Sequence, residues 1–358
     1  MKLTTSELQT AFKIVDLVDT QPGLLSSQFI QLEAKDSKLY LSLTGICVGW
    51  AECPVLEPGP DFTWWLDRRV LSAFLSGASA KTITTVLQKD VLLWKAGAQK
   101  ITSTAMTPVT GYTTWEPKKE AVALNLTPEL AKELALHAQY SPATASADHL
   151  AAVLLVKGYG TLASDSFVIS VGFDKTLTST IKLPGMLAGK LPNGVTSILV
   201  EKAGTGIRFA QGYLYQPLAV NAITSYPLKD ITNVVATHLP VKSVVKIKAK
   251  DLLDALNQIK GYVFGSSIDL RVLCAPSKTT GFASLTLDVI QGKVETSLAA
   301  EYTTDFKLSW ALVKLLPWVE FLYNQDNAAT VVCGQKNDSF VFSVRGNRHY
   351  LLIVAEIT

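Results

Sequence analysis

Three short stretches of similar sequence recur along the chain at a constant spacing. TSEL begins at residue 5, TPEL at residue 127 and AKDL at residue 249, so each lies 122 residues from the next. Each begins a segment with largely apolar residues at positions i, i+4 and i+7, which lie on one side of a helix. The aligned series are Leu8, Leu130 and Leu252; Phe12, Leu134 and Leu256; and Val15, His137 and Ile259. A repeat this long is a repeat of whole domains rather than of a solenoid unit.

The length agrees with this interpretation, because 358 residues exceed what one hydrophobic core usually supports. Each block reads as a helix, strands, a second helix and further strands. The sequence therefore predicts an α+β fold of three tandem domains, with boundaries at 1–118, 119–240 and 241–358.

The second helices are expected at 67–77, 183–191 and 309–322. The middle one should be poorly formed because it contains proline and glycine, and Pro317 should kink or split the last one. Short polar segments at 113–124 and 237–245 are expected to link the domains.

The composition is that of an ordinary soluble protein, with 48% hydrophobic and 18% charged residues. No apolar run approaches the roughly 18 residues of a membrane span, and the N-terminus lacks the apolar part of a signal peptide. We therefore expect an intracellular, cytoplasmic protein with no membrane partner. The four cysteines form no CxxC pair and are expected to be buried thiols.

Signals for catalysis or cofactor binding are absent from the sequence. The four histidines have no metal-ligand spacing, and KAGTGIRFA (202–210) lacks the third glycine and the following helix of a dinucleotide site. Ser164-Asp165-Ser166 is typical of a turn rather than of a nucleophile. His137 is expected to be a packing residue and His349 a surface or edge residue. The sequence predicts no enzyme, metal or cofactor, although a site assembled from distant residues stays open.

Basic residues recur on the predicted helices. They are Lys13, Arg68, Arg69, Lys132, Lys182, Lys190, Lys248, Lys250, Lys260 and Lys314. Because a helix turns its apolar face toward the sheet, these side chains should point toward whatever the helices line. The alternative is an ordinary solvated surface, since acidic residues such as Glu7 and Glu129 lie among them.

This pattern resembles the bacterial DNA sliding clamp, the β subunit of the replicative polymerase, over the whole chain but with little identity. Residues 154–170 are similar to the family's second-domain hairpin, although its Gly, His and Arg are replaced within Ser164 to Ile169. Residues 223–231 resemble a Phe-Pro-Asp-Tyr segment, with Pro227 retained. Residues 305–316 resemble the second helix of the third domain, and 350–358 the terminal strand without its Met-Pro-Met-Arg.

The resemblance implies three clamp-type domains, each with two helices packed on antiparallel sheets, and a head-to-tail homodimer that forms a six-domain ring. Such a ring encircles duplex DNA without reading its sequence and acts as a DNA polymerase processivity factor. The basic residues above would then face DNA. The edge strand near residues 101–106 would meet the third block of the other copy near Val263 and Phe264.

The resemblance also implies partners, namely the polymerase and the clamp loader, which bind through short peptides with Leu and Phe anchors. By position, an apolar groove between the second and third domains would involve Leu150, Ser166, Phe167, Ile169, Pro227, Ile231, Trp310, Leu351, Leu352 and Val354. For Ile169 and Leu352, a place in the interdomain core is an equal alternative. The lost family motifs suggest a different peptide preference and a remote, virus- or plasmid-encoded member. The alternative function is an adaptor that keeps the fold without encircling DNA.

Overall fold

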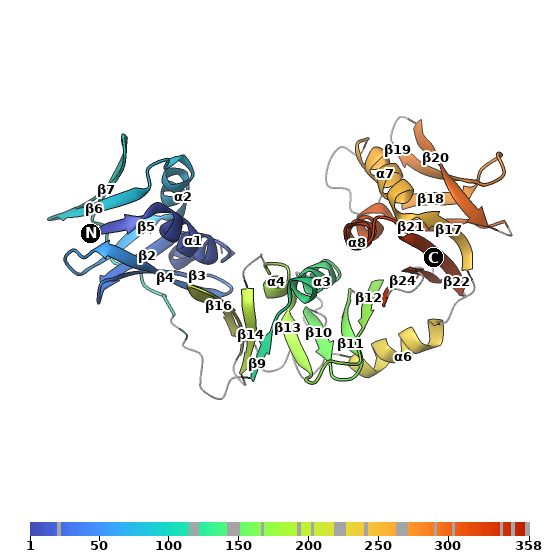
Figure 1. Ribbon diagram of the computed structural model, residues 1–358, viewed down its shortest axis with the longest axis horizontal. Helices are drawn as coiled ribbons and strands as arrows, with labels where there is room; N and C mark the ends of the chain where they lie inside the picture. Colours follow the sequence, from blue (N-terminus) through green and yellow to red (C-terminus); the bar gives the residue numbers. More distant parts are fainter. Residues whose placement is uncertain are drawn as a thin grey trace. The chain divides into compact units, whose positions relative to one another are not determined.

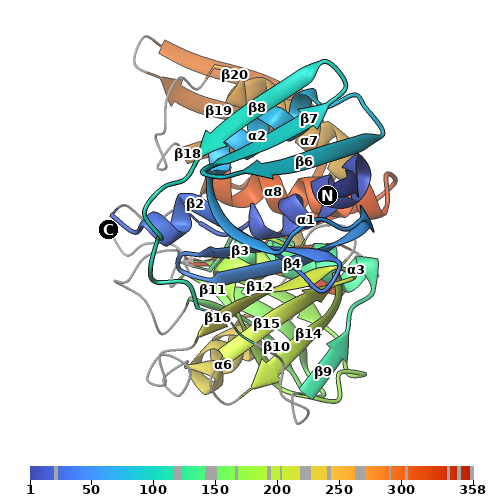
Figure 2. The same ribbon diagram turned by 90° about the vertical axis from the view of Figure 1, so that its left-hand side faces the viewer.

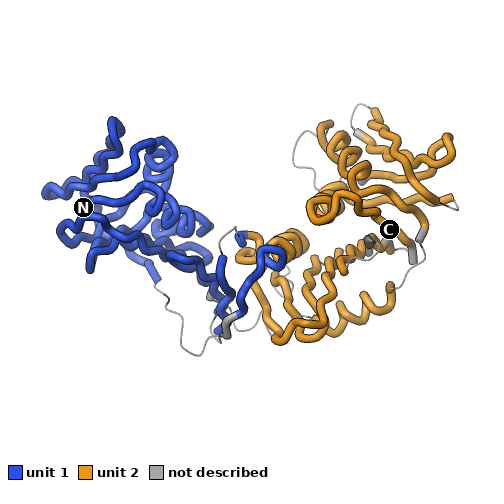
Figure 3. The backbone as a smooth tube through the Cα atoms, viewed as in Figure 1, with its two compact units in different colours: residues 1–131, 190–220 blue, residues 132–189, 221–358 orange. Residues whose placement is uncertain are grey.

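The computed structural model describes residues 1–19, 23–113, 115, 122–141, 151–165, 168–191, 195–201, 204–217, 227–239, 243–262, 271–289, 292–302, 305–336, 339–344 and 348–354. The chain forms two compact units, one of residues 1–131 and 190–220 and one of residues 132–189 and 221–358 (Figure 3).

The order of elements repeats three times in the described chain: a strand, a helix, four strands, a helix and three strands. The first repeat contains β1 (Lys2–Thr4), α1 (Thr5–Val15), β2 (Phe29–Lys35), β3 (Lys38–Thr44), β4 (Val48–Glu57), β5 (Phe62–Asp67), α2 (Arg68–Gly77), β6 (Thr82–Gln88), β7 (Val91–Ala96) and β8 (Gln99–Thr104). A short 3-10 turn, Leu25–Ser27, precedes β2.

The second repeat contains β9 (Val122–Asn125), α3 (Pro128–Ala138), β10 (Ala152–Val156), β11 (Gly160–Ser164), β12 (Val168–Phe173), β13 (Ile181–Pro184), α4 (Gly185–Ala188), β14 (Val195–Glu201), β15 (Gly204–Phe209) and β16 (Gly212–Pro217). The third contains β17 (Ser243–Lys248), α7 (Ala249–Lys260), β18 (Arg271–Pro276), β19 (Phe282–Val289), β20 (Gly292–Tyr302), β21 (Leu308–Ala311), α8 (Leu312–Gln325), β22 (Thr330–Lys336), β23 (Ser339–Val344) and β24 (His349–Val354). Helix α6 (Leu228–His238) lies between these two repeats.

The α+β class and the antiparallel sheets are as predicted, and the first helices α1, α3 and α7 begin at residues 5, 128 and 249. The middle second helix, α4, has only four residues, in agreement with its weak sequence. The two compact units do not coincide with the three repeats, so the boundaries at 118/119 and 240/241 stay a prediction.

Two helices differ from the expectations in part. Helix α8 runs through Pro317 without being split, with buried residues on both sides of it, including Leu315 and Trp318. Proline has no N–H, so the helix loses only one backbone hydrogen bond here, the one to the carbonyl of Val313. Helix α6 was not predicted, although Leu228, Ile231 and Val235 have helical spacing, and its last two residues fall in the segment 237–245 expected as a linker.

The first sheet has the order β8-β7-β6-β1-β4-β16-β15-β14-β9, with β2, β3 and β5 attached through β3 (Figure 2). Strand β4 pairs along one edge with β3 and along the other with β16 and then β1. We call the β4–β16 pairing the first seam, because it joins the last strand of the second repeat to the first repeat. Its register places Tyr213 opposite Trp50.

Aromatic rings cover the first seam on the face turned away from α1. The Trp50 ring stacks on Tyr213 with centroids 5.2 Å apart, and Trp115 stacks on Tyr215 at 4.3 Å. The glycines of KAGTGIRFA leave space for these rings. A Cβ on Gly206 would lie 2.6 Å from the Trp115 ring. The segment therefore serves ring packing.

The second sheet has the order β13-β10-β11-β12-β24-β23-β22-β17-β20-β19-β18-β21. Pairing of β12 with β24, which we call the second seam, joins the last strand of the third repeat to the second repeat. Helices α7 and α8 pack side by side in this unit (Figure 1). The four cysteines are free and buried, as predicted.

Gly206→Ala should displace the Trp115 ring and lower the free energy of unfolding by about 1–3 kcal/mol, because the added methyl overpacks the aromatic cluster. Urea unfolding followed by tryptophan fluorescence would measure the change. Gly189→Ala is the control, since its methyl would meet nothing closer than 3.4 Å. Equal stability of Gly206→Ala and the parent would contradict the packing described here.

Candidate functional site

Three of the residues predicted to line a partner groove meet at the second seam. Ile169 of β12 lies directly opposite Leu352 of β24. Both pack in one core cluster with Ile231 of α6, and their exposed fractions are 4%, 4% and 7%. Helix α6 lies on one face of β10–β12 and α3 on the other (Figure 1). Ile169 and Leu352 are thus interior residues, which is the alternative stated for them above.

Other members of that set lie on the opposite face of the sheet. Leu351 is fully buried opposite Phe342, and the Trp310 ring meets Phe342 edge-on with centroids 5.4 Å apart. Trp318 of α8 contacts the same ring at 6.3 Å. The buried members of the set therefore fill two layers of core beneath α6 and α8, and do not line a single surface.

Of the five remaining members, the structure describes the side chain of one. Pro227 is half-buried at the start of α6. Leu150, Ser166, Phe167 and the side chain of Val354 lie outside the described residues. The peptide-binding role of the whole set stays a prediction.

Six of the ten predicted DNA-facing residues are exposed to solvent. They are Lys13 in α1, Arg69 in α2, Lys132 in α3, Lys248 at the end of β17, and Lys250 and Lys260 in α7. Three positions differ from the expectation of a helix: Lys248 ends a strand, Lys190 lies in the turn after α4, and Lys182 lies on β13, where burial lowers its pKa.

Three of the others are engaged in contacts that hold the fold. The Arg68 guanidinium donates from Nε to Asp16 Oδ1 at 2.6 Å and from Nη1 to the Val18 carbonyl at 2.7 Å, so it caps the C-terminal end of α1. Lys190 follows α4 and forms an ion pair with Asp19 at 2.6 Å. Lys314 pairs with Asp165 of the Ser-Asp-Ser turn.

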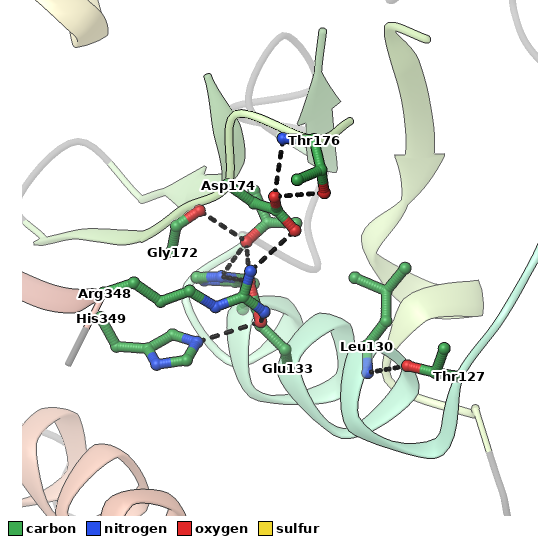
Figure 4. A network of polar contacts seen from close by, with 10 residues as sticks. Thr127, Leu130, Glu133, Gly172, Asp174, Thr176, Arg348 and His349 are labelled. Carbon is green, nitrogen blue, oxygen red and sulfur yellow. Dashed lines mark hydrogen bonds and ion pairs between the residues drawn. The ribbon is translucent and has the colours of Figure 1, made fainter. Parts of the chain in front are cut away.

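A buried carboxylate, Glu133 of α3, holds the densest polar network in the described chain (Figure 4). It is 1% exposed and accepts a hydrogen bond from Arg348 Nη2 at 2.6 Å. His349 Nε2 lies 3.0 Å from the same carboxylate, and Thr161 donates its hydroxyl to it. Gly172 leaves the required space, since a Cβ there would lie 2.3 Å from Glu133 Oε1.

The histidines at this site were assigned only in part by the sequence. His137 is fully buried, as a packing residue would be, but its Nδ1 lies 2.9 Å from Ser170 Oγ and its Nε2 2.9 Å from Thr161 Oγ1. The surface or edge position expected for His349 was wrong. It is 3% exposed, because the Phe321 ring of α8 and the Glu133 carboxylate of α3 lie against its imidazole. Glu133 gave no signal, since a glutamate beside a lysine on a helix usually indicates solvent.

The electrostatics favour an ionised Glu133 beside a neutral His137. Burial acts to raise the pKa of Glu133, but the imidazoles of His137 and His349, whose Nε2 atoms lie 3.8 Å and 3.0 Å from the carboxylate, outweigh it, so this pKa lies below its usual value. Burial lowers the pKa of His137 against the opposing effect of Glu133. Arg348 also donates from Nη1 to Asp174 Oδ2 at 2.8 Å, which spreads the charge to the edge of the site.

A hydroxyl, an imidazole and a carboxylate within hydrogen-bond reach are also the components of a hydrolytic triad. Here Ser170 and Thr161 are 1% and 0% exposed, and His137 and Glu133 are equally enclosed. A substrate cannot reach Ser170, so the arrangement is structural. It ties α3, β11 and β12 to the start of β24.

No group of His, Cys, Asp and Glu in the described chain has the arrangement of a metal site. No described helix is both long and apolar enough for a membrane span.

The sequence matches no protein-family model, and no curated protein matches it either. Solved structures do match. The chain is similar to the β subunit of DNA polymerase III from Pseudomonas aeruginosa, with a TM-score of 0.75 and 14% identity over 99% of this chain and 98% of that one. The β subunit from Thermotoga maritima gives 0.77 and 13% over the same shares. A sliding clamp from Bartonella birtlesii bound to griselimycin gives 0.78 and 11%, again over 99% and 98%. The chain therefore has the fold of bacterial sliding clamps, which confirms the resemblance drawn from the sequence.

Glu133→Ala should lower the free energy of unfolding by about 3–5 kcal/mol, because it leaves Arg348 and His349 without their buried partner. Urea unfolding at pH 7.5 would measure it. Glu129→Ala, on an exposed position of the same helix, should change stability by less than about 0.5 kcal/mol. Similar small losses for both variants would mean that the network contributes little.

Proposed function

We propose that this chain is a DNA sliding clamp, in which two copies pair head to tail and enclose duplex DNA to tether a polymerase. The fold shared with clamps from three bacteria supports this, at 11–14% identity. The chain's own strand order adds independent support.

The observation that carries the proposal is the regular exchange of strands between repeats. The last strand of the second repeat, β16, pairs with β4, and the last strand of the third, β24, pairs with β12. Strands β4 and β12 occupy the same place in the element order, and β20 is their equivalent in the third repeat. The last strand of the first repeat, β8, lies at the end of its sheet and pairs with β7 alone among the described strands.

The equivalent edge of β20 is open in the described chain. Along one edge β20 pairs with β19, and along the other it pairs with β17 only through Ala300–Tyr302. The stretch Gly292–Ser297 therefore offers unpaired backbone groups where β4 accepts β16 and β12 accepts β24. By this rule β8 of one copy would pair with β20 of another, which gives a head-to-tail contact on each chain.

This assignment refines the one made from the sequence. The edge strand expected near 101–106 overlaps β8. Its expected partners, Val263 and Phe264, lie outside the described residues, and the repeat favours β20 instead. That two copies complete the ring is taken from the resemblance to clamps.

The exposed cations suit loose contact with DNA. Each first helix carries at least one exposed lysine: Lys13 in α1, Lys132 in α3, and Lys250 and Lys260 in α7. Lysine acts as a mobile point charge, and phosphate contacts of this kind carry no sequence information. Diffuse attraction would hold the duplex while the protein slides along it.

The second seam and α6 are the proposed place for the polymerase and the clamp loader, which would dock short peptides with Leu and Phe anchors near Pro227 and Ile231. The protein would act in the cytoplasm at the replication fork. A clamp-fold adaptor that binds partners without enclosing DNA is the second candidate, and self-association distinguishes the two.

Replacing Lys13, Lys132, Lys250 and Lys260 by alanine should weaken binding to a non-specific duplex. The slope of log K against log salt should flatten by about 0.9 for each phosphate that the variant no longer neutralises. Fluorescence anisotropy at several salt concentrations would measure it. The control replaces four exposed lysines of strands and turns outside the proposed contact between copies: Lys35, Lys89, Lys157 and Lys278. Equal weakening in both variants would argue against a helix-lined DNA site.

Thr102→Pro should weaken self-association without disturbing the first repeat. Ala105 N donates to the Asp90 carbonyl at 2.7 Å, and Thr102 lies opposite Leu93. Bonded and non-bonded pairs alternate in an antiparallel ladder, so the Thr102 N–H points away from β7. Proline would remove a donor that only another chain could use.

Sedimentation velocity would follow this change, with an expected rise of about tenfold or more in the dissociation constant, because proline removes one backbone bond and disturbs a close fit. Thr102→Val is the control, since it keeps the N–H. A parent protein that stays monomeric at micromolar concentration would support the adaptor instead.

A further inference from the structure

The two seams inside the chain join repeats in the same way, and apolar or aromatic side chains pack at both, including the Phe173–Tyr350 ring pair at the second. They differ in that a buried network of charged side chains also lies at the second seam. At the first seam, Trp50 of β4 stacks on Tyr213 of β16, and Tyr40 stacks on Trp50 with centroids 5.5 Å apart. Ring stacking of this kind does not depend on a protonation state.

At the second seam, the start of β24 is held by charge. Arg348 and His349 both contact Glu133, and Arg348 also bonds Asp174, just past the end of β12. A backbone hydrogen bond joins the same two segments, since Phe173 N donates to the Arg348 carbonyl at 2.9 Å.

The groups that face Glu133 come from four elements. Helix α3 supplies His137 one turn away, β11 supplies Thr161, and β12 supplies Ser170 behind the imidazole. The third repeat supplies Arg348 and His349, and the Phe321 ring of α8 covers His349 with centroids 5.1 Å apart. Asp174 is the second carboxylate of the site.

We propose that the charge of Glu133 latches β24 onto β12, and that acid releases this second seam while the first seam stays closed. A neutral Glu133 would lose its charge-assisted bonds to Arg348 and His349, which are the stronger kind. A protonated His137 would place a further cation beside Arg348 in a site with almost no solvent. This latch lies within one chain and does not depend on whether the chain encloses DNA.

The direction of the pH effect follows from the two shifted groups. Burial lowers the pKa of His137, and its neighbours His349 and Arg348 act in the same sense. Opening the seam admits water and removes both neighbours, so the open form takes up a proton near the ordinary histidine pKa of about 6.5. The pKa of Glu133 is also lower in the closed form, which adds a second proton uptake at lower pH. Because the open form binds more protons, acid favours opening by about tenfold per pH unit for each extra proton.

Hydrogen–deuterium exchange on the full-length protein tests this without any substitution. After correction for the intrinsic pH dependence of exchange, peptides covering β12 and β24 should exchange about tenfold faster at pH 5.5 than at pH 7.5. Peptides covering β4 and β16 should change by less than about twofold. An unchanged β24, or an equal increase at both seams, would overturn the proposal.

Glu133→Gln keeps the shape of the side chain and removes its charge. It should raise exchange in β24 at pH 7.5 toward the acid value of the parent and reduce the further increase at pH 5.5. Glu301→Gln is the control, because this exposed carboxylate pairs with Lys246 at 3.4 Å on a strand of the same unit. If Glu133→Gln does not fold, Asp174→Asn removes the outer ion pair alone and should show the same shift to a smaller extent. Exchange in β24 that neither variant changes would refute the latch.

Discussion

The pairing of each repeat's last strand with a strand of the preceding repeat is the constraint on which the rest of the structure depends. Backbone pairing between β4 and β16, and between β12 and β24, makes one sheet out of parts of two repeats. The second repeat is thereby shared. It gives β9 and β14–β16 to one compact unit, and most of α3 with β10–β13 to the other. Backbone hydrogen bonds require no particular side chains, so the side chains around the two seams differ: aromatic rings cover the first, and the second combines an apolar cluster with buried charged groups.

Some of the basic residues form ion pairs within the fold, whereas others are exposed to solvent. Arg68, Lys190 and Lys314 each reach a carboxylate that lies far away in sequence, at Asp16, Asp19 and Asp165. These cations are part of how loops and helix ends are fixed. Lysines on the outward faces of the first helices have no such role to fill, because the residues on the opposite face of each helix hold it to the sheet. Charge of the same sign therefore serves the fold at some positions and stays available to solvent at others.

How much could be predicted from the sequence depended on how local the determining forces are. The first helices and the weak α4 were predictable, because apolar spacing and poor helix formers act within a few residues. Helix α6 was not predicted, because it lies outside the repeated order of elements and its apolar residues pack on Ile169 and Leu352, which are distant in sequence. The Glu133 network was unpredictable, because Arg348 lies 215 residues away and only the β12–β24 pairing brings it close. The same holds for His349, which is buried by Phe321 and Glu133 rather than by its neighbours in sequence.

The shared second repeat has a consequence for dissecting the protein. A fragment cut at the first boundary would keep β8 with its unpaired edge and would also uncover the edge of β4 that β16 now occupies. Each fragment would then carry two complementary open edges, and such a subunit is divalent. Isolated first repeats should add to one another end to end as filaments. In the whole chain β16 occupies the edge of β4, so the complementary open edges of the described chain are those of β8, in the first repeat, and β20, in the third.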